Sequence, residues 1–243
     1  GTGTCALIPG GSIKCWGYGF YGNMGNGSTS NQSTPVSVSN ISSATSLGGG
    51  YNHICAIISG GSIQCWGNGP YGQMGNGSNS NQSTPVSVSN ISSATSVSGG
   101  EQSNCALLSA GTVSCWGYNN YGQLGNGSIS NSSTPVSVSN LNSVTKISTG
   151  YMHACALLSD DTVKCWGEGS YGMLGNGSTS DQTTPVVVYN INNATNISAG
   201  QKHTCALLSD GTVKCWGYNN FGQLGNGSGS DSSTPVSVSN LNS

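Results

Sequence analysis

The sequence predicts an all-β protein made of five tandem copies of one repeat of about 50 residues. A tryptophan and a proline recur at fixed spacing without a slip in register, and 39 glycines interrupt short runs of β-branched residues. Periods of this length with several short β-runs are typical of propellers and other β-rich arrays. The recurring pair is Trp16 with Pro35, Trp66 with Pro85, Trp116 with Pro135, Trp166 with Pro185, and Trp216 with Pro235.

Each repeat is expected to hold four short strands, exemplified by Ala94–Val97, Cys55–Ser59, Ser62–Trp66 and Pro85–Val88. No segment is a helix candidate, because glycine recurs too often for a 3.6-residue apolar stripe to persist over ten residues. We therefore expect only strands, turns and loops.

The middle two strands form the best-defined element, a hairpin that is clearest between Cys205 and Cys215. A three-residue loop at 209–211, closed by a left-handed glycine, would pair Leu208 with Thr212 and set the two cysteines opposite each other. All ten cysteines stand in such pairs, with nine residues between the members, which favours one disulfide per repeat. The pairs are Cys5 with Cys15, Cys55 with Cys65, Cys105 with Cys115, Cys155 with Cys165, and Cys205 with Cys215.

Two other interpretations of the cysteines stay open. Disulfides between repeats are compatible with the spacing, because spacing does not fix connectivity. A zinc site is disfavoured, because zinc ligand sets prefer closer cysteines. In addition, the histidine slot of His53, His153 and His203 holds Gly3 and Ser103 in the other repeats.

A glycine-rich loop with an aromatic residue and a Leu or Met follows each tryptophan. These apolar side chains are expected to hold the loop on the sheet, since every repeat needs a core, although a sugar-stacking platform is the functional alternative. The residues are Tyr21 and Met24, Tyr71 and Met74, Tyr121 and Leu124, Tyr171 and Leu174, and Phe221 and Leu224.

The motif from Cys205 to Gly225, with its Ser-Asp-Gly-Thr, Trp-Gly and Gly-Gln-Leu-Gly pieces, resembles the regulator-of-chromosome-condensation repeat. A Gly-x-x-His piece precedes it at Gly200–His203. The resemblance extends over the whole chain and implies a β-propeller of four-stranded blades, usually seven. It is most similar to secreted bacterial members, including propeller-type β-lactamase inhibitor proteins.

The sequence departs from that family in its paired cysteines and in its five repeats. We expect a single repeat domain with repeats at about 1–43, 44–93, 94–143, 144–193 and 194–243. The chain starts after a strand like Ala44–Gly50 and stops before one, so one blade would lack a strand. Either the array continues in a longer protein, or a neighbouring chain completes the open ends, as in a filament.

Composition limits the partners and the compartment. Charged residues make up 5% of the chain and the formal net charge is −2, which argues against nucleic-acid binding. No apolar run reaches the roughly 18 to 20 residues of a membrane span, so membrane insertion is not expected. The cysteine pairs predict a secreted, extracellular or cell-surface protein.

The sequence shows no catalytic constellation, and we predict a non-enzyme without cofactor or metal. Its seven acidic residues are scattered, and no nucleophile elbow, phosphate loop or metalloprotease helix occurs. Glycosylation is predicted at the Asn-Gly-Ser sites, although the same tripeptide serves as turn chemistry. These sites are Asn26, Asn76, Asn126, Asn176 and Asn226.

The sequence therefore favours an extracellular structural scaffold, a glycosylated filament-forming subunit whose main partner is itself. The alternative is a secreted module that binds another extracellular protein or a glycan, as an inhibitor does. The near-identity of the outer loops at 28–34 and 78–84 argues against this alternative, because binding modules diversify their exposed loops.

Overall fold

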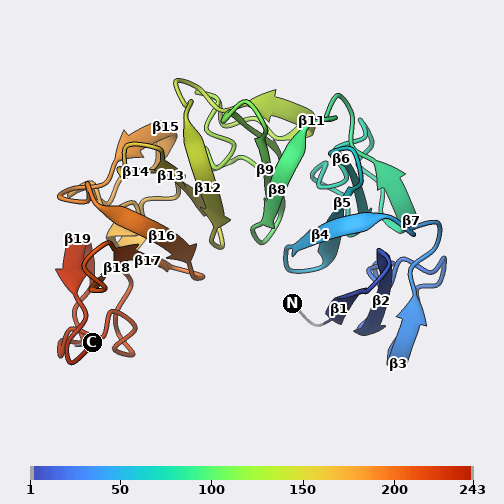
Figure 1. Ribbon diagram of the computed structural model, residues 1–243, viewed down its shortest axis with the longest axis horizontal. Helices are drawn as coiled ribbons and strands as arrows, with labels where there is room; N and C mark the ends of the chain where they lie inside the picture. The colour runs from blue at the N-terminus through green and yellow to red at the C-terminus, as the bar shows by residue number, and fades with distance from the viewer. Residues whose placement is uncertain (1–2, 242–243) are drawn as a thin grey trace. The chain divides into compact units, whose positions relative to one another are not determined.

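A computed structural model describes residues 3–241 and contains five antiparallel β-sheets (Figure 1). The first sheet has three strands: β1 (Gly3–Ile8), β2 (Ser12–Gly17) and β3 (Gln32–Ser37). The second has β4 (Ala44–Gly49), β5 (His53–Ile58), β6 (Ser62–Gly67) and β7 (Gln82–Ser87). The third has β8 (Ala94–Gly99), β9 (Ser103–Leu108), β10 (Val113–Gly117) and β11 (Ser132–Ser137).

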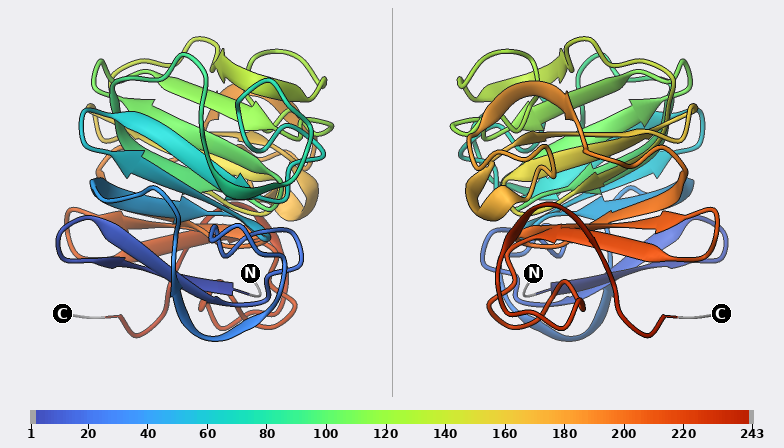
Figure 2. Two further views of the ribbon diagram at one scale, coloured as in Figure 1. Left: turned by 90° about the vertical axis from the view of Figure 1, so that its right-hand side faces the viewer. Right: turned by 90° about the vertical axis from the view of Figure 1, so that its left-hand side faces the viewer.

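The last two sheets repeat the same four-stranded pattern. The fourth contains β12 (Val144–Thr149), β13 (His153–Leu158), β14 (Val163–Gly167) and β15 (Gln182–Val187). The fifth contains β16 (Ala194–Ala199), β17 (His203–Leu208), β18 (Val213–Gly217) and β19 (Ser232–Ser237). In every sheet, consecutive strands are neighbours, and Figure 2 shows each sheet as a layer of such strands. The all-β prediction is confirmed.

Three details differ from the sequence prediction. The strand paired with β5 is Ala44–Gly49, whereas Ala94–Gly99 belongs to the next sheet. The outer strand β7 starts at Gln82, because a shift in register after the Cys65–Val86 pair lets Gly67 pair with Gln82. One short 3-10 turn, Ser170–Gly172, forms where no helix was expected.

The chain divides into two compact parts. The N-terminal part runs to Ser109 and includes Ser114–Tyr118 and Asn131–Val136. The C-terminal part contains Ala110–Val113, Asn119–Ser130 and the residues from Ser137 on. Each part is described by itself below.

The central hairpin has the predicted register. Cys205 pairs with Cys215, the Leu208 N–H donates to the Thr212 carbonyl, and Gly211 adopts a left-handed φ of 82°. The same opposition brings the two Cα atoms of every cysteine pair to 4.1 Å, and each pair forms a disulfide. The prediction of one hairpin disulfide per blade is confirmed.

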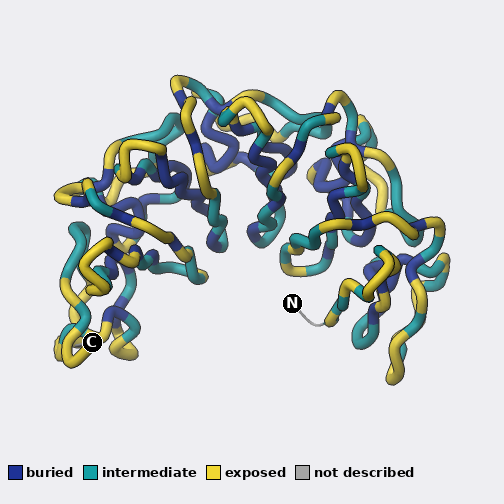
Figure 3. Tube along the Cα trace, viewed as in Figure 1, coloured by how far each residue is buried: buried dark blue, intermediate teal, exposed yellow. Residues whose placement is uncertain are grey.

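The apolar core lies between successive sheets within each part. In the N-terminal part, Ile57 and Met74 of the second repeat pack against Ala106 and Trp116 of the third. In the C-terminal part, Leu157 and Leu174 pack likewise against Ala206 and Trp216. Figure 3 shows that buried residues concentrate in the middle strands and exposed ones in the outer strands and loops.

Each buried tryptophan also makes a hydrogen bond to the preceding repeat. Its Nε1–H donates to a backbone carbonyl, which leaves no polar group of the indole unpaired. The carbonyls belong to Asn23 for Trp66 (3.2 Å), Gln73 for Trp116 (2.8 Å), Gln123 for Trp166 (3.0 Å) and Met173 for Trp216 (3.0 Å). This contact, the tryptophan joint, ties one repeat to the next.

Among the described residues, no helix has the length and apolar character needed to traverse a bilayer.

Candidate functional site

Two loop segments meet at the same end of each four-stranded sheet. His53 pairs with Gly67 at the ends of β5 and β6, so residues 51–52 precede one strand where 68–71 follow the other. The Asn68 N–H donates to the Asn52 carbonyl at 2.9 Å, and the bond recurs from Tyr118 to Gln102 in the N-terminal part. In the C-terminal part it recurs from Glu168 to Met152 and from Tyr218 to Lys202. We call these two segments of each repeat the rim.

The rim holds residues of very different chemistry at equivalent positions. The position of Tyr51 is occupied by Glu101, Tyr151 and Gln201 in the following repeats. The next position carries Asn52, Gln102, Met152 and Lys202. Since the repeats are otherwise close copies, the rim is where the chain varies most in charge and aromatic character. The comparison of outer loops in the sequence therefore missed the diversified surface.

A pocket lies on the rim of the N-terminal part, and its lining comes from three successive repeats. Its volume is about 150 Å³. Tyr51 is 47% exposed, whereas His53 and Gln73 are buried at the base. The lining residues are Tyr21, Tyr51, Asn52, His53, Asn68, Gln73, Glu101 and Gln102.

The rim of the C-terminal part carries an aromatic pocket of about 510 Å³. Tyr171 meets Tyr218 edge to face at 4.9 Å between ring centroids, and the Lys202 Nζ lies 5.0 Å from the Tyr171 ring centroid. Phe221 is 85% exposed, against 38% for its counterpart Tyr171. The prediction that the aromatic and the Leu or Met side chains together hold the loop on the sheet holds only in part: the Leu and Met residues are buried in the core, whereas Tyr171 and Phe221 are exposed.

Below the rim, a buried histidine links two repeats. In the N-terminal part, the Asn104 amide donates to the Gln73 carbonyl at 3.0 Å, which leaves its Oδ1 facing His53 Nε2 at 2.9 Å. Because that oxygen only accepts, His53 carries its proton on Nε2 and its Nδ1 is a bare acceptor. His53 Nδ1 has no hydrogen-bond partner among the described residues.

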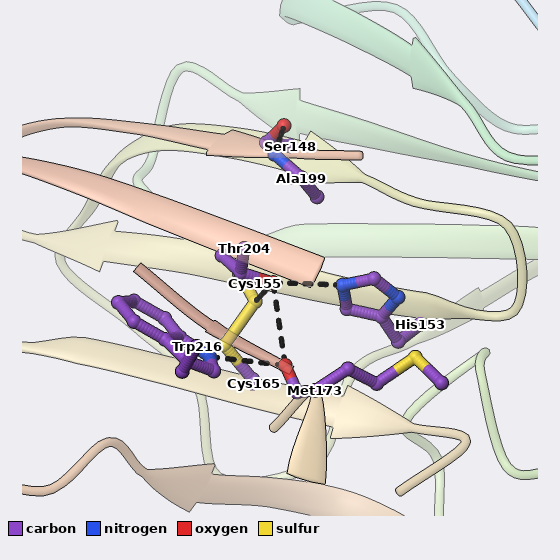
Figure 4. The surroundings of a disulfide bond; sticks show 8 residues. All are labelled: Ser148, His153, Cys155, Cys165, Met173, Ala199, Thr204 and Trp216. Atoms are coloured by element: carbon purple, nitrogen blue, oxygen red, sulfur yellow. Dashed lines mark hydrogen bonds between the residues drawn. A yellow bond between two sulfur atoms is a disulfide. The ribbon is translucent and has the colours of Figure 1, made fainter. Parts of the chain in front are cut away.

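The C-terminal part makes the same link with other residues (Figure 4). His153 Nε2 lies 2.8 Å from the Thr204 hydroxyl, which donates in turn to the Met173 carbonyl at 3.3 Å. This donor chain again places the histidine proton on Nε2. The Trp216 indole donates to the same carbonyl, so the histidine link and the tryptophan joint share one acceptor.

Burial keeps both histidines neutral. Desolvation lowers the pKa of His53 from 6.5 to about 4, although the hydrogen bond to Asn104 opposes the shift. Desolvation also lowers the pKa of His153 to about 4, with a smaller contribution from the charge of His203. Gly50 is required beside the ring, because a Cβ there would lie 2.2 Å from the His53 Cε1.

The described residues show no metal-binding cluster, and two of the acidic side chains belong to turns. Asp160 and Asp210 cap hairpin turns, where hydrogen bonds from Thr162 and Thr212 hold the pKa of each carboxyl below its ordinary value. No group of three His, Cys, Asp or Glu side chains within residues 3–241 is arranged to hold a metal ion.

The five Asn-Gly-Ser sites adopt one turn. In each, the asparagine Oδ1 accepts a hydrogen bond from the serine N–H two residues later, at 3.0 to 3.1 Å. This is the turn chemistry that the sequence allowed. Glycosylation at Asn26, Asn76, Asn126, Asn176 and Asn226 stays a prediction.

Comparison with known proteins identifies the repeat. The family model of the RCC1-like domain matches residues 1–243. The chain is similar to Prp20p of Saccharomyces cerevisiae, a structure described with its binding properties to Gsp1p and histones (TM-score 0.86, 22% identity, 98% of this chain and 61% of that one). It is also similar to human WBSCR16 (TM-score 0.86, 21% identity, 98% and 65%).

A more distant likeness is the ectodomain of the receptor kinase CR4 of Physcomitrella patens (TM-score 0.56, 21% identity, 89% and 48%). The chain spans less than two thirds of the length of each of these structures. No curated protein matches the sequence.

Proposed function

Since this chain belongs to the RCC1-like domain family, we propose that it is a non-enzymatic, extracellular binding module that holds a partner protein at its rim. The five disulfides point to an oxidising compartment. The family fold supplies a rigid framework for loops, and function belongs to the site that those loops form.

The pocket at Tyr51 and Glu101 carries this proposal. Buried core contacts and the histidine link fix its base. The rim positions that line it, such as those of Tyr51 and Asn52, differ between repeats in charge and aromatic character. A pre-formed concave site with a few polar groups and tyrosine rings is what specific recognition requires. The binding that is described for yeast Prp20p offers a precedent for a protein as partner.

A photoreactive phenylalanine analogue placed at residue 51 tests the proposal. Tyr189 is the matched control, because it is also an exposed tyrosine, at 54% against 47%. After irradiation with extracellular material from the native source, we expect a discrete protein adduct from position 51 and none from position 189. Equal adducts at both positions, or none at either, would overturn the proposal.

A second candidate is the structural scaffold that the sequence favours, a glycosylated subunit assembled with copies of itself. The near-identical outer loops and their five turn-forming asparagines support it. Electron microscopy of the native protein, with intact mass measured on the same sample, separates the two candidates. Regular filaments with excess glycan mass support the scaffold, whereas discrete particles at the unmodified mass support the binding module.

A further inference from the structure

The N-terminal rim pocket has the size of a site for one side chain. Its volume of about 150 Å³ is below the roughly 300 to 1,000 Å³ typical of pockets for drug-sized ligands. An oligosaccharide or an extended peptide would therefore not fit inside it. A single protruding group of a larger partner would.

The lining of this pocket carries one charge, and it is negative. Glu101 is the only Asp, Glu, Lys or Arg among the eight lining residues. His53 does not offset it, because the buried imidazole is neutral above about pH 4. The five lysines of the chain all lie elsewhere in the sequence. A cationic group is thus the complement to this pocket.

The neutral residues of the lining also suit a cation. Tyr21 and Tyr51 contribute aromatic rings, whose faces attract ammonium and guanidinium groups. His53 contributes a buried, neutral imidazole to the lining. Gln73 is already committed, with its Oε1 accepting from the Tyr71 N–H and its amide donating to Asn68 Oδ1.

We propose that the pocket binds the cationic side chain, a lysine or an arginine, of the partner protein. Glu101 pairs with the charge, the tyrosine rings enclose the aliphatic stem and face the cation, and the side-chain amide oxygen of Gln102 accepts one of its hydrogen bonds. This assignment rests on the proposed function and specifies the residue type that the rim recognises.

Small probes test the assignment without the partner. N-acetyl-lysinamide and N-acetyl-argininamide are titrated into the full chain, with neutral N-acetyl-norleucinamide as the probe of matched length. Amide NMR shifts report the site of binding. At low salt, we expect a cationic probe to bind at least about tenfold more tightly than norleucinamide.

Variants locate the interaction. Glu101→Gln keeps the shape of the side chain and should reduce the affinity for the cationic probe about tenfold, and Tyr51→Ala should reduce it further. Asp161→Asn removes a negative charge from an exposed hairpin turn that lies outside the rim, and it should change nothing. Equal binding of all probes, or an affinity that Glu101→Gln leaves intact, would overturn the assignment.

The two proposals fail separately. Cation-selective binding without any cross-link at residue 51 would retain the pocket and refute the protein partner. A cross-link without cation selectivity would retain the partner and refute the pocket chemistry.

Discussion

At the residue scale, the buried histidines make the fold sensitive to acid. Each is neutral because burial removes it from water, and each donates its only N–H across to the next repeat. Protonation in the folded state would place an uncompensated charge beside a disulfide and a tryptophan. The unfolded chain pays no such penalty, so acid favours unfolding.

The pH dependence has a definite sign and range. The folded pKa of His53 and His153 is about 4 against an ordinary 6.5, so their contribution is complete above pH 6.5 and is lost as the pH falls toward 4. The expected slope is about 1.4 kcal/mol per pH unit for each histidine, or about 2 kcal/mol each between pH 7 and pH 5. Urea unfolding at a series of pH values measures it.

Serine is the matched replacement, because Ser103 fills the histidine slot of the third repeat and is buried there. The double variant His53→Ser, His153→Ser should unfold at lower urea but with a much flatter pH profile. A variant that keeps the slope of the native chain would show that other groups cause it.

The residues of the site were harder to predict than their surroundings. The histidine slot was visible as part of Gly-x-x-His, and the need for glycine follows from its contact with the ring. Tyr51 and Glu101 occupy equivalent positions yet share no chemistry, so no motif indicates them. The available signal was their divergence between repeats, and only the structure shows that these positions surround one pocket.

At the element scale, the hairpin was predictable to the residue because its turn, its pairing and its cysteines all impose the same register. The bounds of the outer strand could not be predicted in this way. Pro85 looked like a strand start, yet it lies inside β7, an outermost strand of its sheet, where its missing N–H costs no hydrogen bond of the ladder. Gln82 and Ser83 give no strand signal, and Gln82 pairs with Gly67 only because of the shifted register.

The hairpin turn allows a test of backbone conformation alone. Gly211 and Gly229 both have open space where a Cβ would be, but only Gly211 has a left-handed φ, of 82°. Gly211→Ala should therefore lower the free energy of unfolding by about 1 kcal/mol, whereas Gly229→Ala should stay within about 0.5 kcal/mol of the native chain. Equal effects in urea titrations would mean that the turn tolerates alanine.

At the scale of the whole molecule, five disulfides supplement small cores of 8 to 12 buried residues each. Each bridge closes a short loop, and the chain-entropy model assigns such a loop about 2 to 3 kcal/mol. The double variant Cys55→Ala, Cys65→Ala should lose about this much in non-reducing urea titrations. Reductant should lower the native midpoint still further, and a variant that unfolds at the native midpoint would contradict the prediction.

The tryptophan joint explains how neighbouring repeats stay joined although the residue at the acceptor position differs from repeat to repeat. Its acceptor is a main-chain oxygen, offered equally well by Asn23, Gln73, Gln123 and Met173, so the side chain at that position is free to differ. Every described joint therefore uses the same donor group, an indole N–H, and the same kind of acceptor, a backbone carbonyl. A gene encoding these repeats could gain, lose or shuffle whole copies by recombination and still produce neighbours that fit, which makes copy number itself an evolvable property.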